Sequence, residues 1–139
     1  MKNILYIFIA CLVMLTSFSC DRMDDNGPFE GYWHLVACEG GTSSLAPNSD
    51  ITWGVRNELI QMNDLRGSLY YYCTFRRTDH QLELLEAFEN DGTNDTKIEL
   101  SMIPAQFQIP DNGKFEIIEL NSHRMVIKSP KATLHFKKN

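Results

Sequence analysis

The sequence has none of the short motifs that usually mark an enzyme or a metal site. It lacks a His-Glu-x-x-His or Cys-x-x-Cys pattern, a nucleophile elbow and a Walker loop. The histidines lie far apart, mostly on outward strand faces or in turns: His34, His80, His123 and His135. Carboxylates on the predicted strands alternate outward, as Glu99 does. We therefore predict a protein that is not an enzyme, with no catalytic residues, no metal site and no cofactor.

Positive charge is also in short supply. The 139 residues carry 13 Lys and Arg against 18 Asp and Glu, a formal net charge of −5. Lys2 is the one charged residue in the N-terminal leader, segment 1–19, which we interpret as a cleaved signal. Without that segment the chain has 12 Lys and Arg against 18 Asp and Glu, a net charge of −6. A nucleic-acid backbone attracts proteins that present a basic patch. We therefore predict no nucleic-acid partner.

Cysteine is scarce, with 4 in the chain. Cys11 belongs to the leader and Cys20 follows it, which leaves Cys38 and Cys73 for the folded domain. Strand alternation predicts that Cys73 faces inward and Cys38 outward. Two reduced thiols follow from that placement. A disulfide stays open as the alternative, because an exported protein meets an oxidising compartment, but it requires Cys38 to lie beyond the end of its strand.

The chain has one long apolar run, Ile4 to Leu15, behind the positive residue Lys2. That run is too short to span a bilayer comfortably. Small residues and then Cys20 follow it, and this arrangement resembles a bacterial lipoprotein signal. The resemblance implies a signal peptide over residues 1–19 and acylation of Cys20. A plain secretory signal and an uncleaved anchor are the alternatives.

Residues 20–28 are polar and acidic, and we interpret them as a tether between lipid and domain. The acidic residues Asp21, Asp24 and Asp25 look like the export signal of Bacteroidetes surface lipoproteins. A solvated linker explains the same composition. We therefore predict a lipid-anchored protein of the outer membrane, on either the cell surface or the periplasmic face.

The last part of the chain predicts three successive antiparallel strands: Lys114–Leu120, His123–Lys128 and Ala132–Lys137. Links of two or three residues join antiparallel neighbours. Ala132, Leu134 and Phe136 alternate with polar residues, which indicates one buried and one wet face. The first strand changes phase near Ile117 and Ile118, which predicts a β-bulge.

The preceding chain adds further short strands and no convincing helix. We predict strands or bent strand pairs over Gly31–Cys38, Asp50–Met62, Ser68–Arg77, Gln81–Glu86 and Lys97–Met102, and a loop or short edge piece over Pro104–Pro110. Short hairpin links between many strands favour an all-β, antiparallel up-and-down β-barrel, which closes its own edges.

Both ends of this region resemble the lipocalin-like lipoproteins of Bacteroidetes. The opening Gly31-Tyr32-Trp33-His34-Leu35 is similar to the family's Gly-x-Trp-x-Leu, and a second tryptophan, Trp53, follows about twenty residues later. The closing segment from Phe115 to Lys137 is similar as well. The resemblance implies an eight-stranded calyx over residues 29–139, without a C-terminal helix.

Apolar and aromatic residues on the inward faces are the candidate ligand-binding residues. They are Trp33, Leu35, Trp53, Met62, Leu69, Tyr71, Phe75, Leu84 and Met125. An apolar wall with a few polar tips suits a small-molecule pocket, but the same residues suit a filled core. We predict a barrel that binds or carries a small, mostly apolar ligand.

A surface interaction module is the alternative function. Tyr70, Tyr72 and Arg76 share the predicted outer face of one strand, and a long loop runs from Glu39 to Asn48. Exposed tyrosines beside an arginine suit stacking on a sugar or a protein partner. In this reading the protein transports nothing and binds protein or glycan through its outer strands and rim loops.

Overall fold

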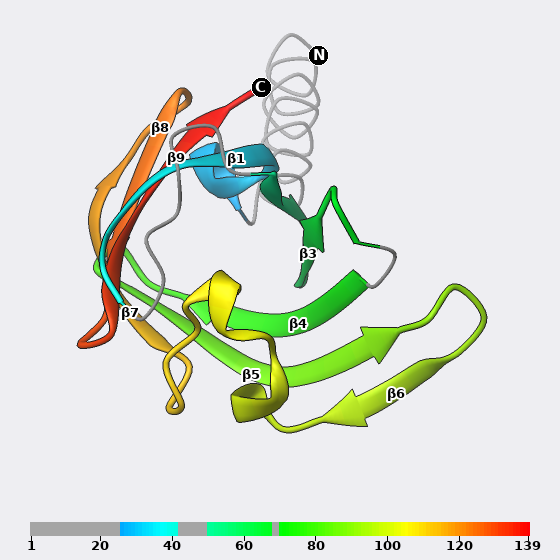
Figure 1. Ribbon diagram of the computed structural model, residues 1–139. Helices are drawn as coiled ribbons and strands as arrows, with labels where there is room; N and C mark the ends of the chain where they lie inside the picture. Colours follow the sequence, from blue (N-terminus) through cyan, green and yellow to red (C-terminus); the bar gives the residue numbers. More distant parts are fainter. Residues whose placement is uncertain (1–25, 42–49, 68–69) are drawn as a thin grey trace, which may run out of the picture.

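The computed structural model describes residues 26–41, 50–67 and 70–139, over which nine β-strands form one antiparallel sheet (Figure 1). The predicted signal peptide, Cys20 and Leu69 lie outside these residues. The strands are β1 Gly31–Gly40, β2 Ile51–Arg56, β3 Leu59–Asp64, β4 Tyr70–Arg77, β5 Gln81–Asn90, β6 Asp95–Ile98, β7 Lys114–Leu120, β8 Arg124–Lys128 and β9 Ala132–Lys138.

Eight of the strands close into a ring. Sequential neighbours pair from β1 to β5 and from β7 to β9, while β5 pairs with β7 and β1 with β9. The short β6 pairs with the end of β5 and stands outside the ring as half of a hairpin. This confirms the predicted antiparallel eight-stranded barrel without a C-terminal helix. In the described part of the chain, no helix is long and apolar enough to cross a membrane.

Three register shifts bend strands of the barrel. The shift between Ile117 and Glu119 confirms the bulge predicted in β7. The shift between Leu35 and Ala37 in β1 was not predicted. It moves Ala37 to the outer face and turns Cys38 toward the core, opposite Leu134. The predicted outward face of Cys38 is therefore wrong, because an extra residue reverses the alternation.

The strand predicted over Lys97–Met102 is also wrong beyond Ile98. β6 ends there, and Leu100–Met102 forms a 3₁₀ turn, η2, that leaves Met102 61% exposed. The partner strand explains this end, because β5 pairs with β6 only between Ala87 and Asn90. Past Ile98 the chain has no partner strand with which to continue the pairing, and it turns toward the barrel mouth.

Residues 99–113 form a plug over one mouth of the barrel (Figure 1). The plug holds η2 and a second 3₁₀ turn, η3, Ala105–Phe107, so the predicted loop over Pro104–Pro110 is confirmed. Ile103, Phe107 and Ile109 are buried, and the Phe107 ring meets the Tyr71 ring edge-on with 5.6 Å between centroids. We call this mouth the plug end.

The opposite mouth is closed by residues just before β1. They form the 3₁₀ turn η1, Gly27–Phe29, which buries Phe29 against Phe75 at 5.2 Å between ring centroids. The Trp33 indole Nε1 donates to the Phe29 carbonyl at 2.8 Å. The C-terminal Lys138 also reaches this turn. We call this mouth the tether end, because the described chain begins here at Asn26.

Candidate functional site

The barrel interior holds nearly all of the predicted lining residues. Seven are buried: Trp33, Leu35, Trp53, Met62, Tyr71, Leu84 and Met125. Phe75 is partly buried and packs on the same core. Leu69 is outside the described residues. Their inward placement agrees with strand alternation, while a role in ligand binding stays a prediction.

Aromatic rings gather around Trp53 in this interior. The Trp53 ring centroid lies 4.8 Å from that of Phe136 and 6.1 Å from that of Phe115. Both partners are inward residues of alternating strands, so the sequence pattern could have placed them in the candidate site. Phe107 completes the interior from the plug. It lies in a segment without strand periodicity, so no sequence signal pointed to it.

One hydrogen-bond donor in this apolar interior, on Trp53, has no acceptor among the described residues. Trp53 is fully buried, and its indole Nε1 finds no hydrogen-bond acceptor within the described parts of the chain. The other tryptophan differs, because Trp33 donates to a backbone carbonyl. Leaving a buried donor unpaired costs about 1–3 kcal/mol. The interior therefore offers one unused hydrogen-bond donor, set among aromatic rings.

The two thiols of the domain are free in the structure. Cys73 lies in the core, and burial raises its pKa to about 12. Cys38 is half-buried, and burial and the neighbouring Glu39 carboxylate raise its pKa. Both groups are therefore protonated at neutral pH, and a protonated thiol is a weak nucleophile.

The predicted outer row on β4 is less open than the sequence indicated. Tyr70 and Tyr72 are half-buried on the outer wall. The Arg76 guanidinium is already paired, with Nη2 2.8 Å from Oε2 of Glu83 on β5. This ion pair lowers the pKa of Glu83. A partner that needs the arginine would have to compete with that carboxylate.

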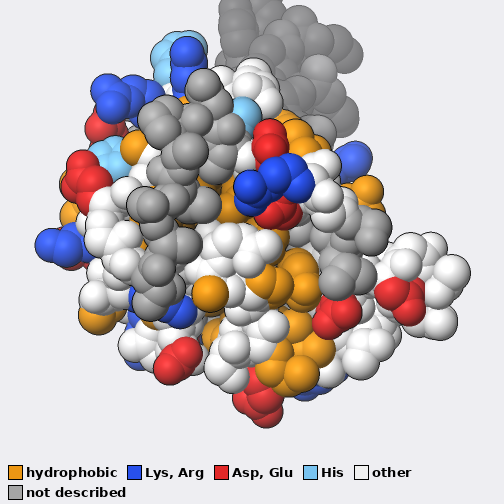
Figure 2. Space-filling view, viewed as in Figure 1, with side chains coloured by type: hydrophobic (Ala, Val, Ile, Leu, Met, Phe, Trp, Pro, Cys, Tyr) orange, Lys and Arg blue, Asp and Glu red, His pale blue; other side chains and the backbone are white. Residues whose placement is uncertain are grey.

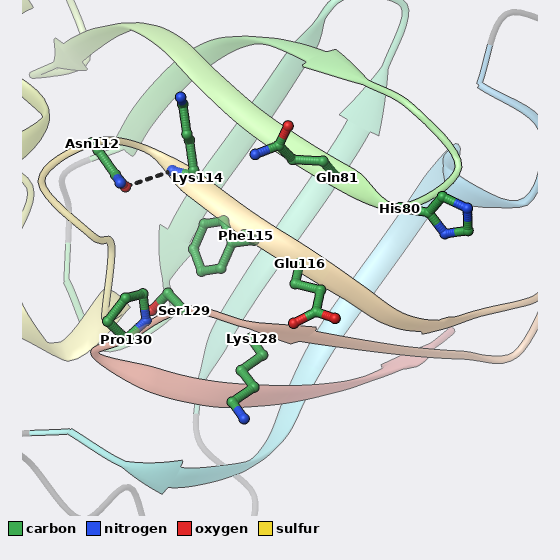
Figure 3. Close-up of a pocket in the computed structure, with 9 residues that line it drawn as sticks. All are labelled: His80, Gln81, Asn112, Lys114, Phe115, Glu116, Lys128, Ser129 and Pro130. Atoms are coloured by element: carbon green, nitrogen blue, oxygen red, sulfur yellow. Dashed lines mark hydrogen bonds between the residues drawn. The ribbon is translucent and has the colours of Figure 1, made fainter.

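The structure shows a second candidate site, a hollow of about 460 Å³ on the outer wall (Figure 3). Its lining comes from the start of β5, from β7 and from the turn between β8 and β9. The charged side chains are Lys114, Glu116 and Lys128, and Asn112 Oδ1 accepts a hydrogen bond from the Lys114 backbone at 3.0 Å. Sequence reasoning missed this hollow, because its residues meet only through the β5–β7 and β7–β8 pairings.

Metal-binding side chains do not converge in the residues that the structure describes. No three His, Cys, Asp or Glu side chains there lie close enough to hold a metal ion. The four histidines occupy four different places, on β1, on β9 and in two turns. The chemistry available to these sites is therefore hydrogen bonding, apolar contact and surface charge.

Comparison with known proteins gives a family and two structural neighbours. A family model described as a lipocalin-like domain matches residues 13–139. A lipocalin-like protein from Bacteroides uniformis superposes with a TM-score of 0.58 at 12% identity, covering 81% of this chain and 100% of that one. An uncharacterized protein from Bacteroides eggerthii gives a TM-score of 0.53 at 15% identity, covering 79% of this chain and 98% of its own. No curated protein matches the chain. At these identities the neighbours support the fold alone.

Proposed function

The chain belongs to the lipocalin-like domain family, and we propose, from that membership and from the signal-like pattern that ends at Cys20, that it is a lipid-anchored outer-membrane protein that binds a small, mostly apolar ligand. A lipocalin-like barrel is a ligand-binding fold in general terms, since eight strands leave an interior that side chains fill or that one small ligand occupies. The proposal assigns the protein to binding or carrying and gives it no catalytic role.

The Trp53 indole is the observation that carries the proposal. A fully buried donor without a partner is rare in folded proteins, and here aromatic rings surround it. A ligand that is apolar overall and carries one acceptor oxygen would satisfy the indole and contact the rings. Binding would thus remove a penalty that the barrel bears without a ligand.

The plug end is the proposed entrance. Two of the polar contacts that hold the plug are long, at 3.4 Å from Gln106 Nε2 to Asp64 Oδ2 and from Lys131 Nζ to the Ile109 carbonyl. Hydrophobic side chains gather on this face of the molecule, over the plug and β5 (Figure 2). Among the exposed ones are Leu65 at 57% and Met102 at 61%. An apolar ligand would meet them first.

The proposed anchor is Cys20, 6 residues before Asn26 in the sequence. An extended chain of that length spans about 20 Å. Acylation of Cys20 would therefore keep the barrel close to the membrane, on the cell surface or the periplasmic face.

Native mass spectrometry of the chain purified from its own membrane tests this function. We expect a stoichiometric small molecule, and extraction should identify its class. The variant Trp53→Phe keeps an aromatic ring and removes the donor, so it should retain less of that molecule. Leu59→Ala is the control, because that exposed side chain lies at the start of β3, at the end opposite the proposed entrance. A bare mass for protein prepared from its native host would contradict the proposal.

A protein or glycan partner on the outer wall is the second candidate function. The hollow in Figure 3 favours it, because Lys128 and Glu116 face each other across β7 and β8 without an ion pair within 4 Å among the described residues. Such groups are free to bind polar ligands. Loss of a pulled-down partner on Glu116→Gln, with Glu58→Gln as control, would support this function over the first.

A further inference from the structure

We propose that the tether end of the barrel rests on an anionic bilayer, with Arg124 and Lys137 contacting lipid phosphates. This inference rests on the membrane anchoring proposed above and adds an orientation and a contact surface to it. It follows from two unpaired cations, the place where the chain leaves the barrel, and the distribution of charge between the two ends.

Arg124 and Lys137 are cross-strand neighbours at the tether end. They lie directly opposite each other on β8 and β9, and both side chains are exposed. Like charges placed directly opposite on a sheet are unfavourable. Neither has a carboxylate within 4 Å in the parts of the chain that are described. An external anion would relieve this repulsion.

Acidic neighbours on the same wall form no ion pair with Arg124 or Lys137 among the described residues. Glu119 is on the adjacent strand β7, opposite Val126, and its carboxylate accepts from the Asn121 amide at 3.2 Å. Glu39 lies further along the wall, where Oε1 is 3.4 Å from His135 Nε2. Neither carboxylate lies within 4 Å of Arg124 or Lys137 in the described residues, so the pair remains open to a third group.

A hollow of about 450 Å³ lies beside the two cations on the outer wall. Its other lining residues are Val36, His123, Val126, His135 and Phe136. Alternation predicts an outward, wet Val126, yet it is only 8% exposed in this depression. An apolar floor next to two cations suits a phosphate headgroup and the first carbons that it carries.

The chain leaves the barrel at this same end. Asn26 contacts the turn between β2 and β3, with Nδ2 donating to the Asn57 carbonyl at 2.7 Å. Cys20 precedes Asn26 by 6 residues, a reach of about 20 Å. An acyl group on that cysteine would hold the tether end, and not the plug end, within headgroup distance.

The balance of charge at the two ends favours the same orientation, with the tether end toward an anionic membrane. The tether end carries five cations near its strand ends, Arg56, Arg77, Arg124, Lys137 and Lys138, against four carboxylates, Glu30, Glu58, Asp79 and Glu119. At the plug end carboxylates outnumber cations: Glu39, Asp50, Asp64, Glu89, Asp91, Asp95 and Asp111 stand against Arg66, Lys114, Lys128 and Lys131. An anionic surface attracts nearby Lys and Arg by about 1 kcal/mol each and repels acids. The barrel should therefore stand with its plug end away from the bilayer.

Lysine footprinting of the full chain in vesicles tests this orientation. A membrane-impermeant acylating reagent is applied to the protein in two kinds of vesicle. One is pure phosphatidylcholine, and in the other roughly one lipid in three is phosphatidylglycerol, which makes the surface anionic. On anionic vesicles Lys137 should react about five-fold more slowly, the factor that one headgroup contact gives. Lys128, at the plug end of β8, is exposed and is the control within the same molecule. Its rate should not change.

Two variants with the same charge change sharpen the test. Arg124→Gln should remove most of the Lys137 protection, whereas Lys97→Gln on β6 should leave it intact. Equal protection on both vesicle types would mean that another group, such as the acidic tether, covers the pair, and would overturn the proposal. Unprotected Lys137, or protected Lys128, would overturn it too. Acylation of Cys20 is read separately from the intact mass, so failure of the anchor and failure of this surface are distinguishable.

Discussion

Truncation of Phe107 tests whether the plug belongs to the barrel core. The side chain is 1% exposed and meets Tyr71 edge-on at 5.6 Å. Replacing a buried phenylalanine with alanine costs about 3–5 kcal/mol, and less where the site can collapse. The plug is a loop with two short 3₁₀ turns, so it can collapse in part. We therefore expect Phe107→Ala to lose about 3 kcal/mol of unfolding free energy.

Such a loss is large against the total stability of a small domain, about 5–15 kcal/mol. Guanidinium unfolding followed by tryptophan fluorescence should show a lower midpoint at an unchanged slope. The midpoint temperature of thermal unfolding should fall by about 10 °C or more. Met102→Ala is the matched control in the same plug, because that side chain is 61% exposed. It should change stability by less than about 0.5 kcal/mol.

A loss below about 1 kcal/mol for Phe107→Ala would refute this reasoning. It would mean that the plug does not pack on the barrel in solution and that the mouth stands open. The expected large loss instead makes the open barrel a minor state. A ligand entering at the plug end would then have to replace the contacts of Phe107, and the indole donor of Trp53 would supply part of that replacement.

Three further predictions concern acid, thiols and turns. Arg66 holds the pKa of Asp64 below its usual range, chiefly by a side-chain hydrogen bond at 3.0 Å. A carboxyl whose pKa is lower in the folded state stabilises the protein above its unfolded pKa, and this stability is lost as the pH falls through the folded pKa. In urea unfolding, Asp64→Asn should therefore lower the free energy of unfolding at pH 7 and much less near pH 2, about two pH units below the usual Asp pKa. Equal losses at both pH values would contradict this. A disulfide reagent near pH 8, below the Cys73 pKa of about 12, should react with Cys73 only after the protein unfolds and slowly with Cys38 in the native state. Rapid reaction of both thiols in the native protein would contradict the described core. Gly113→Ala should destabilise more than Gly92→Ala, since both have positive φ but an added Cβ meets the Leu84 carbonyl oxygen at 2.5 Å only at Gly113; equal losses in chemical unfolding would show that backbone conformation alone decides.

The strands that could be predicted were those whose alternation runs unbroken. In β9, Ala132, Leu134 and Phe136 read as one buried face and are buried. β1 shows the limit, because Val36 adds one residue to a regular pattern, and nothing in its side chain announces this. Every residue beyond the bulge then changes face, which is how Cys38 was misplaced.

The plug and the outer hollows could not be predicted for a different physical reason. Phe107 and Ile109 sit in irregular backbone, where no period links a residue to a face. Lys137 and Arg124 become neighbours only through the pairing of β8 with β9, and each alone is an ordinary surface cation. Such sites depend on register, which alternation within one strand does not determine.

The two ends of the barrel are closed by bonds of different quality, and this difference decides which end can open. At the tether end Lys138 Nζ donates to the Pro28 and Glu30 carbonyls at 2.8 and 2.7 Å, and it lies 4.8 Å over the Trp33 ring. Charge-assisted hydrogen bonds of that length are the strong kind. They join the segment before β1 to the last strand. At the plug end the Leu84 amide donates to the Gly113 carbonyl at 2.8 Å, at the base of the plug, but the side-chain contacts that hold the rest of it are 3.4 Å long. A pull on the N-terminal tether is therefore passed into β9 and the barrel wall, and local opening should begin at the plug.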